Sequence, residues 1–211
     1  MIFTEQALLK LSERLSERMS EKRFRHTLGV ERAAIKIAER CFPSAIFEIR
    51  AAALLHDITK EMSDKEQSDI LKSLSDITES DLLCPSVFHS LTAPYVIKKD
   101  FSAFATDNIL SAVRNHTTGA PDMSLFDEII FISDYIEDGR SYASCISVRE
   151  SLYLKLDKAR DAEECIAALH DAVISALDFT ITNIIKNGNY LNERTVLTRN
   201  AFLGRRPIPL K

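Results

Sequence analysis

Five apolar residues lead directly into a histidine and an aspartate in the segment AAALLHDITK, residues 51–60. Because the run Ala51–Leu55 has no polar side to turn towards water, we expect it to be buried and to carry His56 and Asp57 into the interior. A buried charge without a partner costs on the order of several kcal/mol. The segment therefore raises the question of which group lies opposite these two side chains.

Three more histidines and one aspartate fall at informative places on predicted helices. His26 and His89 each share a helical face with apolar residues, and His116 ends a helix whose preceding turns are apolar. Asp134 lies in the apolar segment EIIFISDYIED, with Ile130 one turn before it. Each of these polar side chains is therefore predicted to face the interior.

Taken singly, each residue has an ordinary structural explanation. A lone histidine on an apolar face is more often a hydrogen-bonded core residue than a ligand. A lone buried aspartate more often accepts a hydrogen bond between helices or pairs with an arginine. His170 is also followed by an aspartate, but no other such residue accompanies it, and we expect it at the surface or its boundary.

Together, these side chains would each add a separate desolvation penalty unless they converge. A divalent cation at the point of convergence removes those penalties together. Imidazole and carboxylate ligands suit iron, manganese or another first-row metal better than calcium, and the absence of thiolate ligands argues against a structural zinc site. We therefore expect a metal ion opposite His56 and Asp57, with His26 and Asp134 completing its ligand set.

The composition favours one soluble, all-α multi-helix bundle. The chain has 211 residues, of which 45% are hydrophobic and 27% charged, with only 5 glycines and no alternation of apolar and polar residues that would indicate strands. We expect an amphipathic helix over residues 1–20 packed on the domain, a domain over 21–186, and a tail over 187–211 that is loop with room for one further turn. The expected helices are 4–20, 24–41, 46–58, 64–75, 79–83, 86–99, 105–115, 124–138, 144–156 and 161–186.

The net charge and the cysteines limit which binding partners and which cellular compartment we expect. A net charge of −4 argues against a nucleic-acid scaffold and favours a small-molecule ligand. No apolar stretch approaches the ~20 residues needed to span a bilayer, so we expect no membrane association. The four scattered cysteines are expected to be reduced thiols in a cytoplasmic protein. A homo-oligomer is left open.

At the same residues the sequence resembles the HD-domain metal-dependent phosphohydrolases, whose pattern is H…HD…D on an all-helical fold. Within that superfamily, it more closely resembles the YqeK family, the symmetrical bis(5′-nucleosyl)-tetraphosphatases. The matching segments are RFRHTLGV, ALLHDITKE, VFHS, HTTGAPDMSLFDEIIFISDYIEDGR and NGNYLNERTVLTRN, in order over roughly residues 20 to 200. The HD pair is common to the superfamily, whereas the HTTG…MS…DYIE stretch is specific to the family.

The resemblance implies roles for individual residues. It implies iron ligands at His26, His56, Asp57 and Asp134. It also implies nucleotide and phosphate contacts at Arg23, Lys60, His89, His116, Thr117, Tyr135, Arg140 and Thr180. The chain departs from the family at Ala93–Pro94, at Ser133 and Asp138, and at residues 192–195, where NERT replaces HPDT. None of these changes falls on a proposed metal ligand, and those at Ala93–Pro94 and 192–195 bear on nucleoside preference more than on chemistry.

The chemistry of three of these side chains suits them to catalysis. Lys60 follows Asp57 by about one helical turn if the helix continues, and Arg140 could offer a planar fork to phosphate oxygens. We expect Asp57, Lys60 and Arg140 to be catalytic, the alternative for Lys60 and Arg140 being solvated charges at helix ends. His89 and His116 could donate hydrogen bonds to a polyphosphate or bind a second cation.

The predicted function is symmetrical hydrolysis of diadenosine tetraphosphate to two ADP by attack of metal-bound water on a central phosphate. The substrate would be a small dinucleoside polyphosphate. One alternative keeps the metal site and changes the substrate to a cyclic nucleotide, a deoxynucleotide or a guanosine alarmone. Another is a nucleotide-binding sensor without turnover.

Overall fold

The computed structural model describes residues 3–205, and this range contains eleven α-helices, three short 3-10 turns and no strand. The expected all-α class is confirmed. The helices are α1 (Glu5–Ser16), α2 (Glu21–Cys41), α3 (Ile46–Leu55), α4 (Asp64–Leu71), α5 (Glu79–Leu82), α6 (Phe88–Asp100), α7 (Asp107–Asn115), α8 (Leu125–Ile136), α9 (Ala143–Lys158), α10 (Ala162–Lys186) and α11 (Glu193–Gly204).

Side-chain caps fix where several helices begin. The Thr4 hydroxyl accepts a hydrogen bond from the Ala7 amide at the start of α1. Ser124 caps α8 in a capping box, in which its hydroxyl accepts from the Asp127 amide and the Asp127 carboxylate accepts from the Ser124 amide. Such reciprocal bonds satisfy amides that a helix leaves without partners in its first turn.

One expected boundary is wrong at a place that matters for the site. The sequence predicts a helix over 46–58, but α3 ends at Leu55 and His56 is its C-cap. Tight turns follow, in which the Lys60 amide donates to the Asp57 carbonyl at 2.9 Å. Lys60 is therefore placed by a turn and not by a continuing helix.

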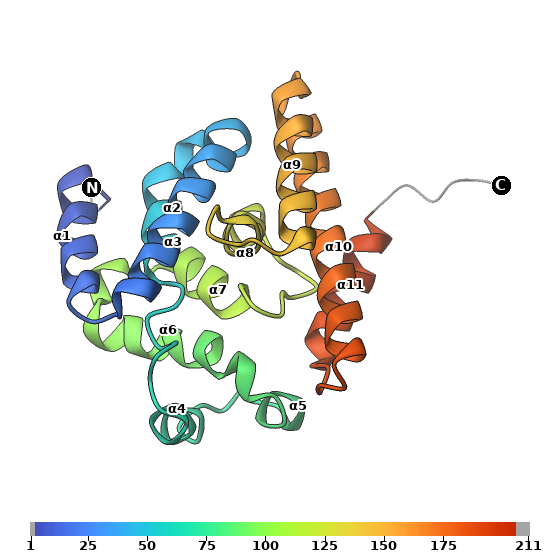
Figure 1. Cartoon of the computed structure of the whole chain (residues 1–211). Helices are drawn as coiled ribbons and strands as arrows, with labels where there is room; N and C mark the ends of the chain where they lie inside the picture. The colour runs from blue at the N-terminus through green and yellow to red at the C-terminus, as the bar shows by residue number, and fades with distance from the viewer. Residues whose placement is uncertain (1–2, 206–211) are drawn as a thin grey trace.

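Helix α8 lies at the centre of the bundle (Figure 1), and apart from Tyr135 and the two ends its side chains are almost all buried. It packs against α2, α3 and α7 on one side and against α9 and α10 on the other. Helix α1 packs on α3 through the buried leucines Leu8, Leu11 and Leu15. Helices α4 and α5 lie at the lower edge in Figure 1, where α4 packs on α6 and a small apolar cluster forms around Leu71 and Leu91.

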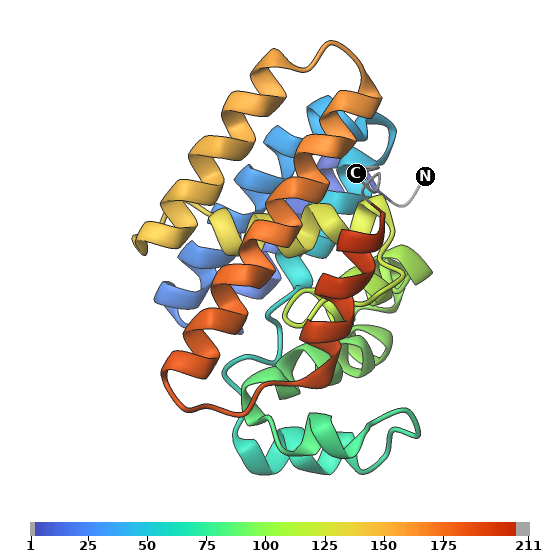
Figure 2. The same cartoon turned by 90° about the vertical axis from the view of Figure 1, so that its right-hand side faces the viewer.

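The expected loop in the tail is wrong for residues 193–204, which form the twelve-residue helix α11. Figure 2 shows α11 lying beside α10, and the two helices pack together. Its buried side chains are Thr195, Thr198 and Phe202. Because two of these three buried residues are threonines, the helix lacks the apolar periodicity from which it could have been predicted. Residues 206–211, which end the expected tail, lie outside the described range, as do residues 1 and 2.

Within the described residues, α10 alone is long and apolar enough to cross a membrane on length and composition. Core helices of soluble proteins pass the same test, and 44% of the apolar window is buried against the rest of the fold. The helix packs against α2, α8, α9 and α11. All four cysteines are free and buried, as expected of reduced thiols.

Candidate active site

Two histidines of the site end helices in the same way. His56 is the C-cap of α3, and its Nδ1 lies 2.7 Å from the Ala53 carbonyl oxygen. His116 is the C-cap of α7, and its Nδ1 lies 2.7 Å from the Val113 carbonyl oxygen. A carbonyl can only accept, so Nδ1 carries a proton in both rings, and in the neutral form of each ring Nε2 presents a lone pair. One bond therefore satisfies a carbonyl at the end of each helix and fixes the tautomer that a metal ligand requires.

The His26 ring, in the second turn of α2, is oriented by a carboxylate from another segment. Its Nδ1 lies 3.2 Å from Oε1 of Glu137, which is buried and follows α8. Oε2 of the same carboxylate accepts the Gly139 amide at 2.6 Å. Because Glu137 accepts at Nδ1, the Nε2 atom of His26 is free to act as a ligand.

Four groups converge on one point at the ends of α2, α3 and α8. His26 Nε2 lies 3.0 Å from Oδ1 of Asp134 and 3.7 Å from Oδ2 of Asp57. His56 Nε2 lies 3.3 Å from Oδ2 of Asp57 and 3.9 Å from Oδ1 of Asp134. The ligand atoms offered by His26, His56 and Asp134 all lie within 4.8 Å of one another, close enough to hold one ion.

The other oxygen of Asp57 faces a second pair of histidines. Oδ1 lies 3.4 Å from Nε2 of His89 and 3.6 Å from Nε2 of His116. The two Nε2 atoms are 3.1 Å apart. His56, Asp57 and His116 form a second group that could hold a metal ion. Asp57 is thus placed to bridge two neighbouring positions.

Orphaned polar atoms test whether these residues fit a cation. Among the described residues, Nε2 of His26, Nε2 of His56 and Oδ1 of Asp57 are buried and make no hydrogen bond. Native proteins leave few such atoms, because each costs about 1–3 kcal/mol. These three, out of eight such atoms among the described residues, lie in one cluster and are ligand types that first-row metals bind. The donor set therefore fits a divalent cation.

Two arginines neutralise the carboxylates of the cluster. Arg23 donates to Oδ2 of Asp57 at 2.6 Å, and Arg140 donates to Oδ1 of Asp134 at 2.5 Å. Burial acts to raise the pKa of both carboxyl groups, but it is outweighed. His56 and the other nearby histidines hold the pKa of Asp57 well below its usual range, and Arg140 with His26 does so for Asp134. Both aspartates are therefore ionised and able to act as ligands.

Lys60 contacts His89 beside the cluster. Lys60 Nζ lies 3.1 Å from each ring nitrogen of His89, and Thr117 Oγ1 lies 3.1 Å from its Nε2. Burial lowers the pKa of His89 well below its usual value, so this imidazole is neutral. Burial also lowers the pKa of Lys60. An ammonium that is poorly solvated gains more from an incoming phosphate than one in bulk water does.

Two clefts meet at the cluster. The histidine cleft, of about 370 Å³, is lined by residues that include Asp57, Asp134, Lys60 and Thr180. The arginine cleft, of about 850 Å³, is lined by His26 and by the segment 137–142 facing the start of α2. Arg23 and Arg140 line both. The proposed ligands therefore lie where the two clefts join.

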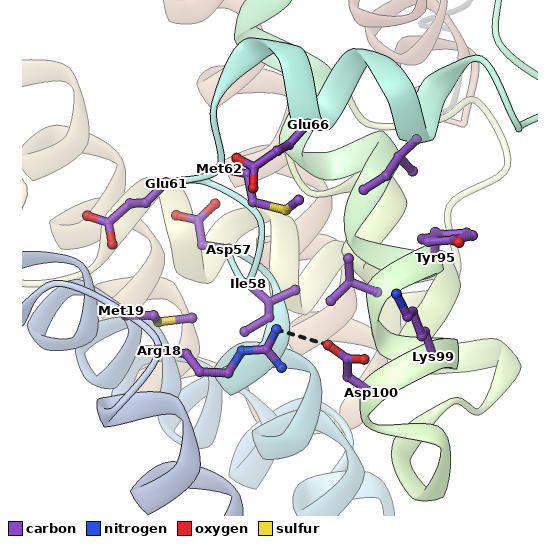
Figure 3. A pocket seen from close by; sticks show the side chains of 12 residues that line it. Arg18, Met19, Asp57, Ile58, Glu61, Met62, Glu66, Tyr95, Lys99 and Asp100 are labelled. Atoms are coloured by element: carbon purple, nitrogen blue, oxygen red, sulfur yellow. Dashed lines mark hydrogen bonds and ion pairs between the residues drawn. The ribbon is translucent and has the colours of Figure 1, made fainter.

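A third cavity of about 480 Å³ lies beside the turns that follow α3 (Figure 3). It shares Asp57 with the site, and its other lining residues come from the loop after α1, from residues 58–62, and from α4 and α6. An ion pair of 2.9 Å between Arg18 and Asp100 crosses one side of it (Figure 3). No histidine lines this cavity, so we place the candidate chemistry in the two clefts.

Residues 23–139, more than half of the chain, match the family model described as HD domain. The chain belongs to the HD domain family. HD domains bind divalent metals, and the cluster of His26, His56, Asp57 and Asp134 lies within the matched segment.

Named relatives match most of the chain. A protein of Halalkalibacterium halodurans called bis(5′-nucleosyl)-tetraphosphatase, symmetrical, is 29% identical over 185 residues, which is 88% of this chain and 91% of the relative. A Bacillus subtilis protein of the same name is 27% identical over 186 residues, 88% of this chain and 92% of that one. The crystal structure of a predicted HD superfamily hydrolase involved in NAD metabolism from Clostridium acetobutylicum is 28% identical, with a TM-score of 0.79 over 93% of this chain and 97% of that one.

All the site residues that the family resemblance implies lie close together in the structure. Four of them form the cluster, and the histidine cleft is lined by all of the others, including Thr180 from the distant helix α10. His170 lies elsewhere, half-buried, with Nε2 3.2 Å from Glu128. Its expected position at the boundary of the surface is confirmed, whereas the roles of the other residues remain proposals.

The residues that position the proposed ligands were not predicted from the sequence. Gly29 lies against the Glu137 carboxylate, and a Cβ at that position would be 2.5 Å from its Oε2. Arg149 of α9 donates to the carbonyl oxygens of Ile136, Glu137 and Arg140, which fixes the loop after α8. Glu137, the glutamate of the DYIE segment, could have been noticed in the sequence, but its contact with His26 could not, because the two residues are 111 positions apart.

The tail helix also supports the site. Gly119 has a φ of +69°, which favours glycine, and a Cβ there would be 2.6 Å from Cγ2 of Thr198 on α11. The Gly119 amide donates to the Asn115 carbonyl at 2.8 Å, which closes the turn that carries His116 and Thr117. Helix α11 therefore packs directly on the turn that presents these two residues to the histidine cleft.

Proposed function

We propose that this protein hydrolyses diadenosine tetraphosphate to two ADP with a divalent metal ion. The observation that carries the proposal is the convergence of His26, His56, Asp57 and Asp134 where two cation-lined clefts meet. The names of the relatives, which match over 88% of the chain, support this substrate.

His26, His56, Asp57 and Asp134 would hold the metal, and iron is the ion we propose, with manganese or another first-row metal as the alternative. A divalent cation in this position supplies Lewis acidity, which lowers the pKa of water and polarises phosphate oxygens. Asp57 Oδ1, with His89 and His116, offers a position for a second cation. Without such an ion, His89 would donate to the polyphosphate, and His116 would do so only with both ring nitrogens protonated, because its Nδ1 already donates to the Val113 carbonyl.

The remaining side chains bind and orient the polyphosphate. One water is consumed: its oxygen bonds to a central phosphorus, and the bond from that phosphorus to the central bridging oxygen breaks. The bridging oxygen leaves with the second ADP, and the protons of the water pass to the product phosphates or to solvent. Lys60 and Arg140, which line the histidine cleft, would stabilise the charge that grows on the leaving diphosphate. Arg140 is held for this task by Asp134.

The product pattern tests the symmetry of cleavage. Purified protein supplied with ferrous or manganous ion should convert diadenosine tetraphosphate to ADP alone. AMP together with ATP would refute symmetrical cleavage. Turnover of a cyclic nucleotide, a deoxynucleotide or a guanosine alarmone in place of this substrate would support the other phosphohydrolase function. Nucleotide binding without metal or turnover would indicate a sensor.

Variants of the ligands test the site itself. His56→Ala and Asp57→Ala should each lose bound metal and nearly all hydrolysis, because each removes a group from the cluster. His170→Ala is the matched control, since it removes an imidazole that lines neither cleft. Wild-type metal content and turnover in both ligand variants would refute the assignment. The cytoplasmic location remains a prediction from cysteine usage.

A further inference from the structure

The proposed residues account for only one of the two clefts that meet at the cluster. The histidine cleft, of about 370 Å³, contains every nucleotide contact implied by the sequence. The arginine cleft, of about 850 Å³, begins at His26 and at the two shared arginines and extends along α2 away from them. A substrate cut at its centre has two equal halves, and each half needs a place on either side of the attacked phosphorus.

The arginine cleft carries an excess of positive charge. Its lining includes five cationic side chains and two carboxylates, those of Glu137 and Asp138. Glu137 is already bonded to His26 and to the Gly139 amide. The side chain of Asp138 is 71% exposed and lies 3.8 Å from Arg149. Among the described residues, neither carboxylate forms an ion pair with Lys22, Arg25 or Arg32 on α2.

Those cations lie on one face of the helix. Lys22, Arg25 and Arg32 follow one another at spacings of three and seven residues, so they share the face that also bears Gly29. Ten residues of helix separate the first from the last, a rise of about 15 Å. Glycine in the middle of this row leaves the floor of the cleft free of a side chain except for the Glu137 carboxylate that lies over it.

Two of the cations have no counter-ion. Among the described residues, Lys22 and Arg32 make no ion pair or hydrogen bond, and Arg25 pairs with Glu21 only at the exposed surface. Nε of Arg23, at the junction of the clefts, is buried without a hydrogen-bond partner. Unpaired guanidinium and ammonium groups along a concave surface are suited to phosphate oxygens.

We propose that the arginine cleft binds the second nucleoside diphosphate half of the substrate, with Lys22 and Arg32 contacting its phosphates. Tyr142 lines the same cleft with its side chain 71% exposed and offers an aromatic face to the nucleoside base. Arg23 and Arg140, which line both clefts, hold the centre of the polyphosphate chain. This assignment rests on the proposed function, because it requires a substrate with two nucleotide halves.

The test compares a Lys22→Ala/Arg32→Ala double variant with wild type at physiological ionic strength. Both side chains lie on the exposed surface of α2, so the fold should be unaffected. With metal bound, the double variant should show kcat/KM for diadenosine tetraphosphate lowered about tenfold or more, through loss of charge-assisted bonds. Its metal affinity should equal that of wild type, because neither residue touches the cluster.

Binding of ADP separates the two clefts. Calorimetric titration of the metal-loaded wild type should show two ADP molecules bound per chain, of which the tighter occupies the histidine cleft. The double variant should lose the weaker site and keep the tighter one. The matched control is Lys10→Ala/Lys98→Ala, which removes the same charge from exposed positions on α1 and α6 that line neither cleft.

The outcomes distinguish this inference from the proposed function. Absence of diadenosine tetraphosphate turnover in the wild type defeats the proposed function. Wild-type turnover that is unchanged in the Lys22/Arg32 variant, or lowered equally in the Lys10/Lys98 control, overturns the arginine-cleft assignment alone. An ADP stoichiometry of one in the wild type overturns it as well.

Discussion

Gly29→Ala should weaken metal binding without touching a proposed ligand. The new Cβ would lie 2.5 Å from Oε2 of Glu137 and 3.3 Å from its Cδ. Restoring an ordinary contact of about 3.5 Å displaces the carboxylate by about 1 Å. The bond from Nδ1 of His26 to Oε1 of Glu137, 3.2 Å long, cannot survive that shift.

The expected size of the effect follows from the role of Glu137. Losing a group that orients a ligand typically costs about 10–100-fold in metal affinity, or about 1.4–2.7 kcal/mol. Alanine in a helix interior gains roughly 0.5–1 kcal/mol over glycine, so thermal stability without metal is a poor readout. The assay is therefore the dissociation constant for manganese, measured by calorimetry beside the melting temperature of the metal-free protein.

Matched variants isolate the cause. Glu137→Gln should weaken manganese binding in the same range, because a neutral amide is a poorer acceptor for the Nδ1 proton of His26. Gly139→Ala should act similarly, since its Cβ would lie 2.9 Å from Oε2 of Glu137. Gly204→Ala is the control, with nothing within 4 Å of the added Cβ. Wild-type manganese affinity in both Gly29→Ala and Glu137→Gln would refute the reasoning.

Three further predictions concern the phosphate contacts, the tail helix and the metal. Lys60→Ala and Arg140→Ala should lower kcat/KM by about ten- to a thousandfold with metal content intact, and wild-type kinetics in both would make them solvated charges. Gly119→Ala should lower the melting temperature and turnover together, because the backbone has a φ of +69° and the added Cβ would lie 2.6 Å from Thr198. The control is Gly188→Ala, which also has a positive φ but no neighbour within 4 Å. Equal losses of melting temperature and turnover in the two variants would exclude the contact with α11 as the cause. Manganese at 100 times its dissociation constant should stabilise the protein by about 2.7 kcal/mol, which raises the melting temperature by roughly 5–10 °C. A chelator should reverse this rise and His56→Ala should abolish it. An equal rise in the His56→Ala variant would show that the metal binds elsewhere.

The sequence by itself determined the fold class and nearly all of the helices, and it was enough to propose the metal ligands. Apolar periodicity is local information, so ten helices could be predicted from short windows of sequence. His56 and Asp57 stood out because an apolar run delivers them to the interior, and the Nδ1 bond of His56 to Ala53 is also local, spanning one helical turn. A residue type and its nearest neighbours sufficed for these conclusions.

The tertiary structure alone decided how the ligands are held and what surrounds them. Glu137 reaches His26 across 111 residues only because α8 packs on α2 over Gly29. Helix α11 escaped prediction because its buried face includes threonines, whose burial depends on α10 and on the turn at Gly119. The arginine cleft exists because α2 faces the loop after α8. Periodicity shows that a side chain points inward, but packing between distant segments decides what it meets there.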